Sequence, residues 1–358
     1  MTIRILVLGA SYGSLPAAKL LMAGHRVTLV CTRPTAELIN REGTVVRFPP
    51  RGGAAPLDVA SRELPGALDA APPELVDPAP YDLVVLGMQE AQYGAPGVRG
   101  LMGRIAAARR PCLAIMNMPP LAYLRRIAGL WMRPIERCYA DAGVWDGFDP
   151  SLVTLASPDP QAFRPADQPK NFLQVGLPTN FKAARFDAEA PTALLRRLAD
   201  DIERARLVRP GETIELPVKL KVHDSLYVPL AKWPMLIAGN YRCIRAEHTI
   251  SIREAVHGNL PRSRAIYEWV AALCLRLGAA PADLVPFEKY AQAAQGLGKP
   301  SSAARALFAG APRIERVDRL VHCIARELGE AHEALDETVA LVDARLERNR
   351  LGEERAAA

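Results

Sequence analysis

The sequence has 358 residues, a net charge of +6 and an apolar fraction of 49%. This apolar fraction excludes a disordered chain, and at roughly 150 residues per domain the length predicts two domains. The weak positive charge contains no block of like charges, and no apolar run reaches the roughly 18 residues of a membrane-spanning helix. We therefore expect neither a nucleic-acid nor a membrane partner. The six cysteines form no C-x-x-C pair, which predicts reduced core thiols, a cytoplasmic protein and no metal site.

The first third of the sequence alternates segments typical of strands and of helices. Ile3–Leu8 is an apolar run rich in β-branched residues, as in a strand buried on both faces. A glycine-containing turn over Gly9–Ser14 follows, then a helical segment over Leu15–Ala23 and a second strand over Arg26–Cys31. Together these segments predict a βαβ unit.

Two further buried strands are predicted at Tyr81–Gly87 and Pro111–Met116, with a helix over Leu101–Ala108 between them. Strands that alternate with helices indicate a parallel, doubly wound sheet. Residues 49–80 contain eight prolines, which predict short strands and loops.

The second half of the sequence is helical in pattern. Apolar faces are predicted for helices that begin at Thr192 and that span 264–277 and 313–328, whereas strand signals disappear after about residue 222. We place the boundary near 205–215, with an α/β domain over 1–210 and an all-helical domain over 211–358. An amphipathic helix over Glu330–Arg350 packs either on its own domain or on a partner subunit, as in a homodimer.

The first turn between strand and helix has features of a dinucleotide-binding site. Glycines permit close approach of the backbone, and the helix N-terminus receives a pyrophosphate. The spacing is G-x-x-x-G, one residue shorter than the usual G-x-G-x-x-G, and an ordinary tight turn is the alternative. The candidate cofactor-binding residues of this turn are Gly9, Ser11, Tyr12, Gly13 and Ser14.

The charge pattern around this turn favours NADPH over NADH. Sites for NAD usually end the second strand with an acidic residue that binds the ribose hydroxyls. Here the strand ends at Cys31-Thr32-Arg33, and no acidic residue precedes Glu37. Arg33 suits a 2′-phosphate, although a solvated strand end is the alternative.

Three polar residues in the second half are candidates for proton transfer. If the segment is helical, Lys219, His223 and Tyr227 fall at i, i+4 and i+8 on one face. A lysine, an imidazole and a phenol in line can handle a proton. A helix with a mixed polar face is the alternative.

The order of several segments resembles the ketopantoate reductase family, the 2-dehydropantoate 2-reductases, over most of residues 1–330. The matching segments are ILVLGASYGSLPAAKLLMAGHRV at the start, Tyr81–Gln92, Ile115-Met116-Asn117, ELPVKL, and Ser301-Ser302 followed by Glu315. The resemblance implies a Rossmann-type N-terminal domain and an all-α C-terminal domain similar to that of 6-phosphogluconate dehydrogenase. It also implies reduction of a 2-oxo acid, a small carbonyl substrate, by hydride transfer from a nicotinamide cofactor.

The resemblance also assigns roles to individual residues. Lys219 is then the general acid, Glu315 orients the substrate or the lysine, Ser301 or Ser302 binds the substrate, and Asn117 and Gln89 lie near the cofactor. Two alternatives stay open, a surface charge for Glu315 and a helix cap for Ser301. We expect burial to lower the pKa of Lys219, and Lys221, two residues further along a helix, to face away from the cleft that Lys219 lines.

Departures from the family pattern bear on the substrate. The family has asparagines four and eight residues after its lysine, where this sequence has His223 and Tyr227. We therefore expect ketopantoate to be a poor substrate. Two other functions remain open: an opine-type dehydrogenase that uses His223 as acid or base, and an NADP(H)-binding sensor without catalysis.

Overall fold

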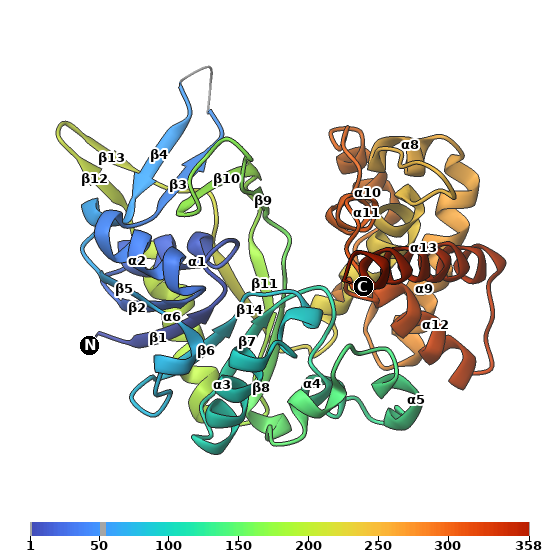
Figure 1. Cartoon of the computed structure of the whole chain (residues 1–358), viewed down its shortest axis with the longest axis horizontal. Helices are drawn as coiled ribbons and strands as arrows, with labels where there is room; N and C mark the ends of the chain where they lie inside the picture. The colour runs from blue at the N-terminus through green and yellow to red at the C-terminus, as the bar shows by residue number, and fades with distance from the viewer. Residues whose placement is uncertain (1, 51–54, 358) are drawn as a thin grey trace. The chain divides into compact units, whose positions relative to one another are not determined.

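The computed structural model describes residues 2–50 and 55–357, so part of the proline-rich stretch over 49–80, namely residues 51–54, lies outside the described residues. The chain forms two compact units (Figure 1). The first unit comprises Met1–Met88, Gln92–Arg126 and Gly143–Asp224, and the second comprises Gln89–Ala91, Ile127–Ala142 and Ser225–Ala358.

The first unit is built on an eight-stranded sheet in the order β14-β11-β8-β7-β6-β1-β2-β5. The bounds are β1 Arg4–Leu8, β2 Arg26–Val30, β5 Ala67–Ala71, β6 Leu83–Leu86, β7 Cys112–Ile115, β8 Val153–Ser157, β11 Phe181–Ala184 and β14 Leu220–His223. Six neighbouring strands, from β8 to β5, are parallel, whereas β11 is antiparallel to β8 and carries β14 parallel to itself. The predicted Rossmann-type sheet is confirmed, with two reversed strands added at one edge.

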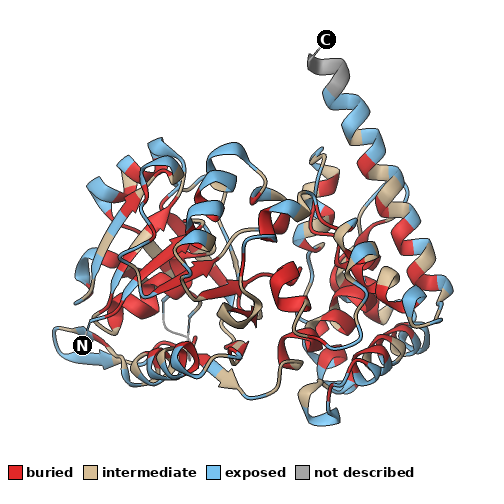
Figure 2. Ribbon diagram, turned by 90° about the horizontal axis from the view of Figure 1, so that it is seen from below, coloured by how far each residue is buried: buried red, intermediate tan, exposed pale blue. Residues whose placement is uncertain are grey.

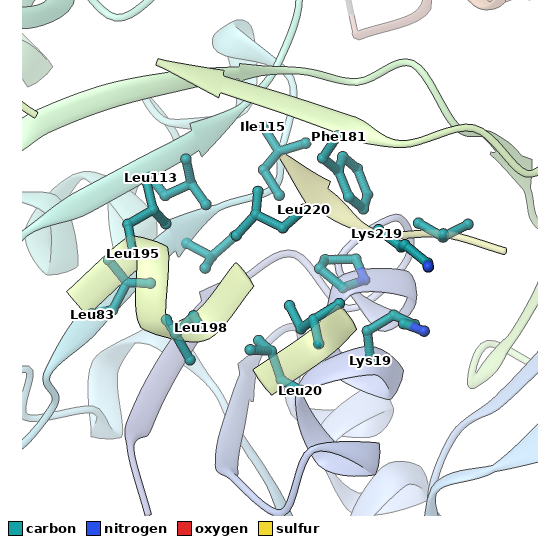
Figure 3. A pocket seen from close by; sticks show the side chains of 14 residues that line it. Lys19, Leu20, Leu83, Leu113, Ile115, Phe181, Leu195, Leu198, Lys219 and Leu220 are labelled. Atoms are coloured by element: carbon teal, nitrogen blue, oxygen red, sulfur yellow. The ribbon is translucent and has the colours of Figure 1, made fainter. Parts of the chain in front are cut away.

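Helices bury their apolar faces against this sheet. Helix α1 (Ser14–Met22) is buried along its whole length, and α6 (Glu189–Arg204) presents Leu195, Leu198 and Ile202 to the core. In Figure 3, Leu195 and Leu198 of α6 lie close to Leu83 and Leu113, which belong to strands of the sheet. Helices α2 (Arg33–Glu42) and α3 (Pro96–Ala107) complete the alternation of strand and helix expected from the sequence.

A smaller sheet of four strands belongs to the same unit. Its order is β4 (Leu57–Ala60), β3 (Val45–Phe48), β10 (Phe172–Leu177) and β9 (Gln161–Phe163). Figure 1 shows these strands side by side, with β9 at one edge. A separate hairpin joins β12 (Leu207–Arg209) to β13 (Glu212–Ile214). The β9–β10 hairpin brings residues after β8 back toward the first strands of the chain.

The second unit is helical, as predicted. Its main helices are α5 Met132–Glu136, α7 Lys232–Met235, α8 Ile252–His257, α9 Leu260–Arg276, α10 Phe287–Ala294, α11 Ser302–Phe308, α12 Val317–Glu327 and α13 Glu333–Ala357. A π-helical segment over Leu236–Asn240 continues α7. Among the described residues of this unit, β structure is limited to one isolated bridge between Ile244 and Thr249.

Residues 211–224 belong to the first unit, so the boundary expected near 205–215 lies too early. The helix expected through Lys219, His223 and Tyr227 is also wrong, because β14 pairs with β11 over Leu220–His223. The physical reason is visible in the sequence: Val218, Leu220 and Val222 alternate with lysines, which is the period of a strand.

The C-terminal helix α13 packs on its own unit. It contacts α11 and α12, and Leu335, Val342 and Leu346 are buried. Figure 2 shows the buried residues in the earlier turns of this helix, and Leu351 is 46% exposed. Of the two alternatives for this helix, packing on its own domain is therefore observed, and a homodimer stays a prediction.

Candidate cofactor and active site

Three glycines meet where β1 ends and α1 begins. Gly9 has a φ of +99°, and a Cβ there would lie 2.6 Å from Cγ of Met88. A Cβ on Gly13 would lie 2.1 Å from the carbonyl oxygen of Gly9, and one on Gly87 would lie 3.1 Å from that of Leu8. A side chain at Gly13 would therefore displace backbone, and side chains at Gly9 and Gly87 would be crowded. Glycine at positions 9 and 13 therefore permits the tight turn and the close packing of helix on strand that are typical of dinucleotide-binding turns.

Among the other residues of the turn, some form hydrogen bonds that stabilise it and one is exposed to solvent. Ser14 donates from its hydroxyl to the carbonyl oxygen of Ala10 at 2.5 Å, which closes the turn. The hydroxyl of Tyr12 donates to the carbonyl oxygen of Pro160 at 2.6 Å. Ser11 is exposed, and the first turn of α1 carries no acidic residue that would repel an anion.

Arg33 is the first residue of α2 and follows the last residue of β2, Val30, by three positions. Its guanidinium forms an ion pair with Oε1 of Glu74 at 3.0 Å, and both side chains are more than half exposed. An exposed pair of this kind contributes less than about 1 kcal/mol, so Glu74 does not hold the guanidinium tightly. The sequence did not reveal Glu74, which stands 41 residues away and brings an acidic group to this edge of the sheet.

Asn117 follows β7, and Gln89 follows β6. Residues Leu8, Leu86 and Ala114 are in register across β1, β6 and β7, so the loops after these strands leave the same edge of the sheet as Gly9. Asn117 is half-buried and Gln89 is exposed. This edge is where α/β sheets bind their ligands.

Lys219 lies between two carboxylates. Its Nζ is 2.6 Å from Oε1 of Glu203 and 2.5 Å from Oε1 of Glu215. Hydrogen bonds to Glu203 and then to Glu215 raise the pKa of Lys219, so the expected lowering is wrong. Lys221 also pairs with Glu203, at 2.9 Å, because residues i and i+2 of a strand share a face. Lys219 and Lys221 therefore lie on the same side of the strand, not on opposite sides of a helix as expected.

A second lysine lies beside Lys219. Lys19 of α1 is 2% exposed, and burial, with Lys219 as the next cause, lowers its pKa to about 8. Figure 3 shows both amino groups on one side of an apolar cavity of about 30 Å³. Lys19 donates to the carbonyl oxygen of Leu216 at 3.4 Å. The cavity is too small and too apolar to receive an organic acid, and we assign it no ligand.

His223 and Tyr227 belong to different units. His223 ends β14, opposite Ala184. Tyr227 precedes a short helical turn over Val228–Ala231 and donates from its hydroxyl to the carbonyl oxygen of Leu277 at 2.6 Å. The phenol of Tyr227 therefore serves as the donor of a structural hydrogen bond. Lys219, His223 and Tyr227 do not line up on one helix face.

Two buried carboxyls lie together in the second unit. Oε1 of Glu315 accepts from the amide of Glu90 at 3.3 Å, and Oε1 of Glu90 accepts from the amide of Ala140 at 2.9 Å. Glu315 is 7% exposed and Glu90 is 3% exposed, so a surface charge is excluded for Glu315. Burial, with the charge of Glu315 adding to it, raises the pKa of Glu90 to about 7. Such a pair holds a proton near neutral pH, as acid–base sites often do.

Replacing Glu90 by glutamine is expected to weaken the dependence of stability on pH. The carboxyl has a pKa of about 7 in the folded chain against an ordinary 4.5, so the native state binds more protons between these values. Wild-type stability therefore falls as pH rises through this window, by on the order of 3 kcal/mol. Urea unfolding at pH 5 and pH 8 measures the difference, and the same pH dependence in both proteins would contradict the assignment.

A buried network fixes the turn that presents Glu315. The hydroxyl of Tyr241 donates to the carbonyl oxygen of Glu315 and accepts from the amide of Val317. Arg316 makes two hydrogen bonds with Asp318, at 3.0 and 2.9 Å, and a third with Asp343 at 2.6 Å. Arg316 is 8% exposed and Asp318 is fully buried, so this ion pair is shielded from solvent.

Ser301 caps α11. Its hydroxyl accepts from the amide of Ala304 at 3.1 Å and donates to the carbonyl oxygen of Asn240 at 2.7 Å. The helix-cap alternative is therefore observed, while the neighbouring Ser302 is exposed as the first residue of α11. The second bond ties α11 to the end of the π-helical segment.

Lys232 and Asn240 were not among the candidate residues taken from the sequence. The segment from Val228 to Asn240 is helical, with Lys232 at the start of α7 and Asn240 at the end of the π-helical segment. Their separation of eight residues is that of the family lysine and its second asparagine, a signal that was present in the sequence. Lys232 is half-buried.

The π-helical segment has a local cause. Tyr290 donates from its hydroxyl to the carbonyl oxygen of Met235 at 3.0 Å, and a Cβ on Gly239 would lie 2.0 Å from that hydroxyl. The phenol therefore takes a helical carbonyl and requires glycine at 239. Segments of this type are frequent at functional sites.

Within residues 2–50 and 55–357, no cluster of three or more His, Cys, Asp and Glu side chains could bind a metal ion. Over the same part of the chain, no helix is long and apolar enough to span a membrane.

Solved structures share this fold. The sequence matches no protein-family model and no curated protein sequence. D-mandelate dehydrogenase in a ternary structure with NADH and anilino(oxo)acetate aligns over 97% of this chain and 99% of its own, with 13% identity and a TM-score of 0.65. The 2-dehydropantoate 2-reductase from Methylococcus capsulatus aligns over 97% and 98%, with 16% identity and a TM-score of 0.65.

Dimeric ketopantoate reductase from Staphylococcus aureus aligns over 97% of this chain and 100% of its own, with 11% identity and a TM-score of 0.61. Likenesses at such low identity show the fold alone. The chain therefore has the two-part fold of the ketopantoate reductases and of D-mandelate dehydrogenase, as the sequence resemblance implied.

Proposed function

We propose that the protein is an NADPH-dependent reductase of a 2-oxo acid or a related carbonyl compound. The observation that carries this proposal is the glycine junction of Gly9, Gly13 and Gly87 in a fold shared with D-mandelate dehydrogenase and ketopantoate reductases. The tight glycine turn and the absence of an acidic residue from the first turn of α1 fit a pyrophosphate. The bound nicotinamide would supply a hydride to the carbonyl carbon of the substrate.

The residues of the first unit would bind and orient this cofactor. The turn at Gly9–Ser14 holds the pyrophosphate, and Arg33 offers a cation after β2 for a 2′-phosphate. Asn117 lies after β7, at the edge where Gly9 also lies, and its amide is suited to hold a polar group of the cofactor.

A carbonyl oxygen that gains negative charge needs a proton, and we propose Lys232 as its donor. Lys232 lies on a helix eight residues before Asn240, whose carbonyl oxygen accepts a hydrogen bond from Ser301. Lys219 is the less suitable candidate. Its hydrogen bonds to two carboxylates raise its pKa, whereas a general acid works best with a pKa near the working pH. The carboxyls of Glu315 and Glu90 would orient the donor and keep a proton in reserve.

The experiment that tests the function has two steps. Isothermal titration first compares NADPH with NADH, and a panel of 2-oxo acids is then followed at 340 nm, with and without an added amino acid. We expect tighter binding of NADPH and turnover of at least one 2-oxo acid alone. Turnover only with the amino acid would indicate an opine-type reaction, and binding without any turnover would indicate a sensor. No binding of either nucleotide would overturn the proposal.

Ketopantoate is expected to be a poor substrate within this panel. Counted from Lys232, the first asparagine position of the family is Leu236, which cannot form a hydrogen bond with a substrate. We expect a kcat/KM below the usual enzyme range of about 10⁴ M⁻¹s⁻¹. Turnover of ketopantoate at or above that range would contradict this prediction. In that case the variant Leu236→Asn should bring no improvement in kcat/KM for ketopantoate.

A further inference from the structure

The segment after β8 lies at the glycine turn. β8 is parallel to β7, so its last residue, Ser157, lies at the edge of the sheet where the loops after β1 and β2 begin. The hydrogen bond from Tyr12 to Pro160 then fixes the segment to the turn. Ala162 of β9 packs against the same apolar core as Tyr12 and Cys31. The segment that leads into the β9–β10 hairpin therefore lies beside the glycine turn after β1.

Arg164 comes directly after β9 and has an unusual environment. Its Nε is buried and has no hydrogen-bond partner. Across the described part of the chain, no carboxylate forms an ion pair with Arg164, and its charge acts on the thiol of Cys31, the residue after β2. Burial raises the pKa of that thiol to about 11, so Cys31 stays neutral and does not balance the guanidinium.

Other arginines of the same unit contrast with this one. Arg47 forms a bidentate pair with Asp58 at 2.6 and 2.7 Å, and Arg126 pairs with Asp187 at 2.7 Å. A partly buried guanidinium without an anion is unfavourable, because desolvation is not offset by hydrogen bonds. Burial accordingly lowers the pKa of Arg164. Such a group is prepared for an anion that arrives from solution.

We propose that Arg164 binds the 2′-phosphate of the cofactor and is the main determinant of selectivity for NADPH over NADH. The assignment rests on the proposed function. In dinucleotide-binding folds the end of the second strand receives the adenosine ribose, and Cys31 follows that strand here. A guanidinium binds phosphate in a bidentate fashion, and Arg164 is partly buried without a carboxylate partner, whereas Arg33 is exposed and pairs with Glu74.

The test compares the dissociation constants of NADPH and NADH in the full chain by isothermal titration. Arg164→Met keeps the apolar stem of the side chain and removes the charge. It is expected to weaken NADPH binding by about ten- to hundredfold and to change NADH binding less than about threefold. Arg33→Ala is expected to have a smaller effect on NADPH. Lys170→Ala removes an exposed charge from the connection between β9 and β10 and is the matched control, expected to match wild type.

Three results would overturn the assignment. The first is equal loss of NADPH and NADH affinity in Arg164→Met, and the second is unchanged NADPH affinity in that variant. Arg164→Lys, which restores the charge, should recover part of the selectivity, so that a folding defect is distinguished from loss of the phosphate contact. The third is that wild type binds neither nucleotide, which would overturn the proposed function as well, whereas the first two leave that function intact.

Discussion

Replacing Lys232 by alanine is expected to lower kcat by about two to four orders of magnitude and to leave NADPH affinity nearly unchanged. The expectation follows from its place on the helix that leads to Asn240, whose carbonyl oxygen accepts from Ser301. A general acid acts in the transition state, so its loss appears in kcat. Steady-state rates with the best substrate of the panel, together with NADPH titration, measure both quantities.

Lys219→Ala is the matched comparison for this prediction. Lys219 has two carboxylate partners, and the effect on kcat should stay within about threefold if it serves only as an ion pair. Lys232→Arg keeps the charge but holds its proton too firmly, so kcat should remain low. A large loss in Lys219→Ala with a near-normal Lys232→Ala would transfer the acid role to Lys219.

Replacing Arg316 by methionine is expected to lower the free energy of unfolding by about 3–5 kcal/mol. Methionine fills a similar volume, but the fully buried carboxylate of Asp318 then has no cation. Because Arg316 follows Glu315 directly, the turn that presents the Glu315 carboxyl should loosen as well. Urea unfolding followed by tryptophan fluorescence measures the loss of stability.

Arg262→Met is the control for the Arg316 prediction. Arg262 also pairs with a carboxylate, Glu337, at 2.6 Å, but both side chains are about half exposed. Its loss should cost less than about 1 kcal/mol. The double variant Arg316→Met with Asp318→Asn should recover part of the stability, since the unpaired charge is removed. Equal effects of the two single variants would show that burial does not set the strength of the Arg316 pair.

Local pattern was sufficient for the central part of the first unit. Ile3–Leu8 and Pro111–Met116 are short, largely apolar runs typical of a strand buried on both faces, and the structure places β1 and β7 there. The turn that contains Gly9 and Gly13 could also be predicted from the sequence, because it is formed by only a few consecutive residues. The helical second half followed from apolar faces with the helical period, as in α9 and α12.

The site depended on partners distant in the sequence. Lys219 was expected to be a buried general acid. Its amino group instead donates a hydrogen bond to Glu203, 16 residues earlier on α6, which stabilises the protonated lysine. Glu90 and Glu315 lie 225 residues apart and meet only in the folded second unit. Arg164 interacts electrostatically with Cys31, more than 130 residues earlier, and β9, which precedes Arg164, pairs with β10, which in turn pairs with β3. Periodicity records which face of a segment is buried, whereas the pKa and the ligand of a charged group depend on what the tertiary structure packs against it.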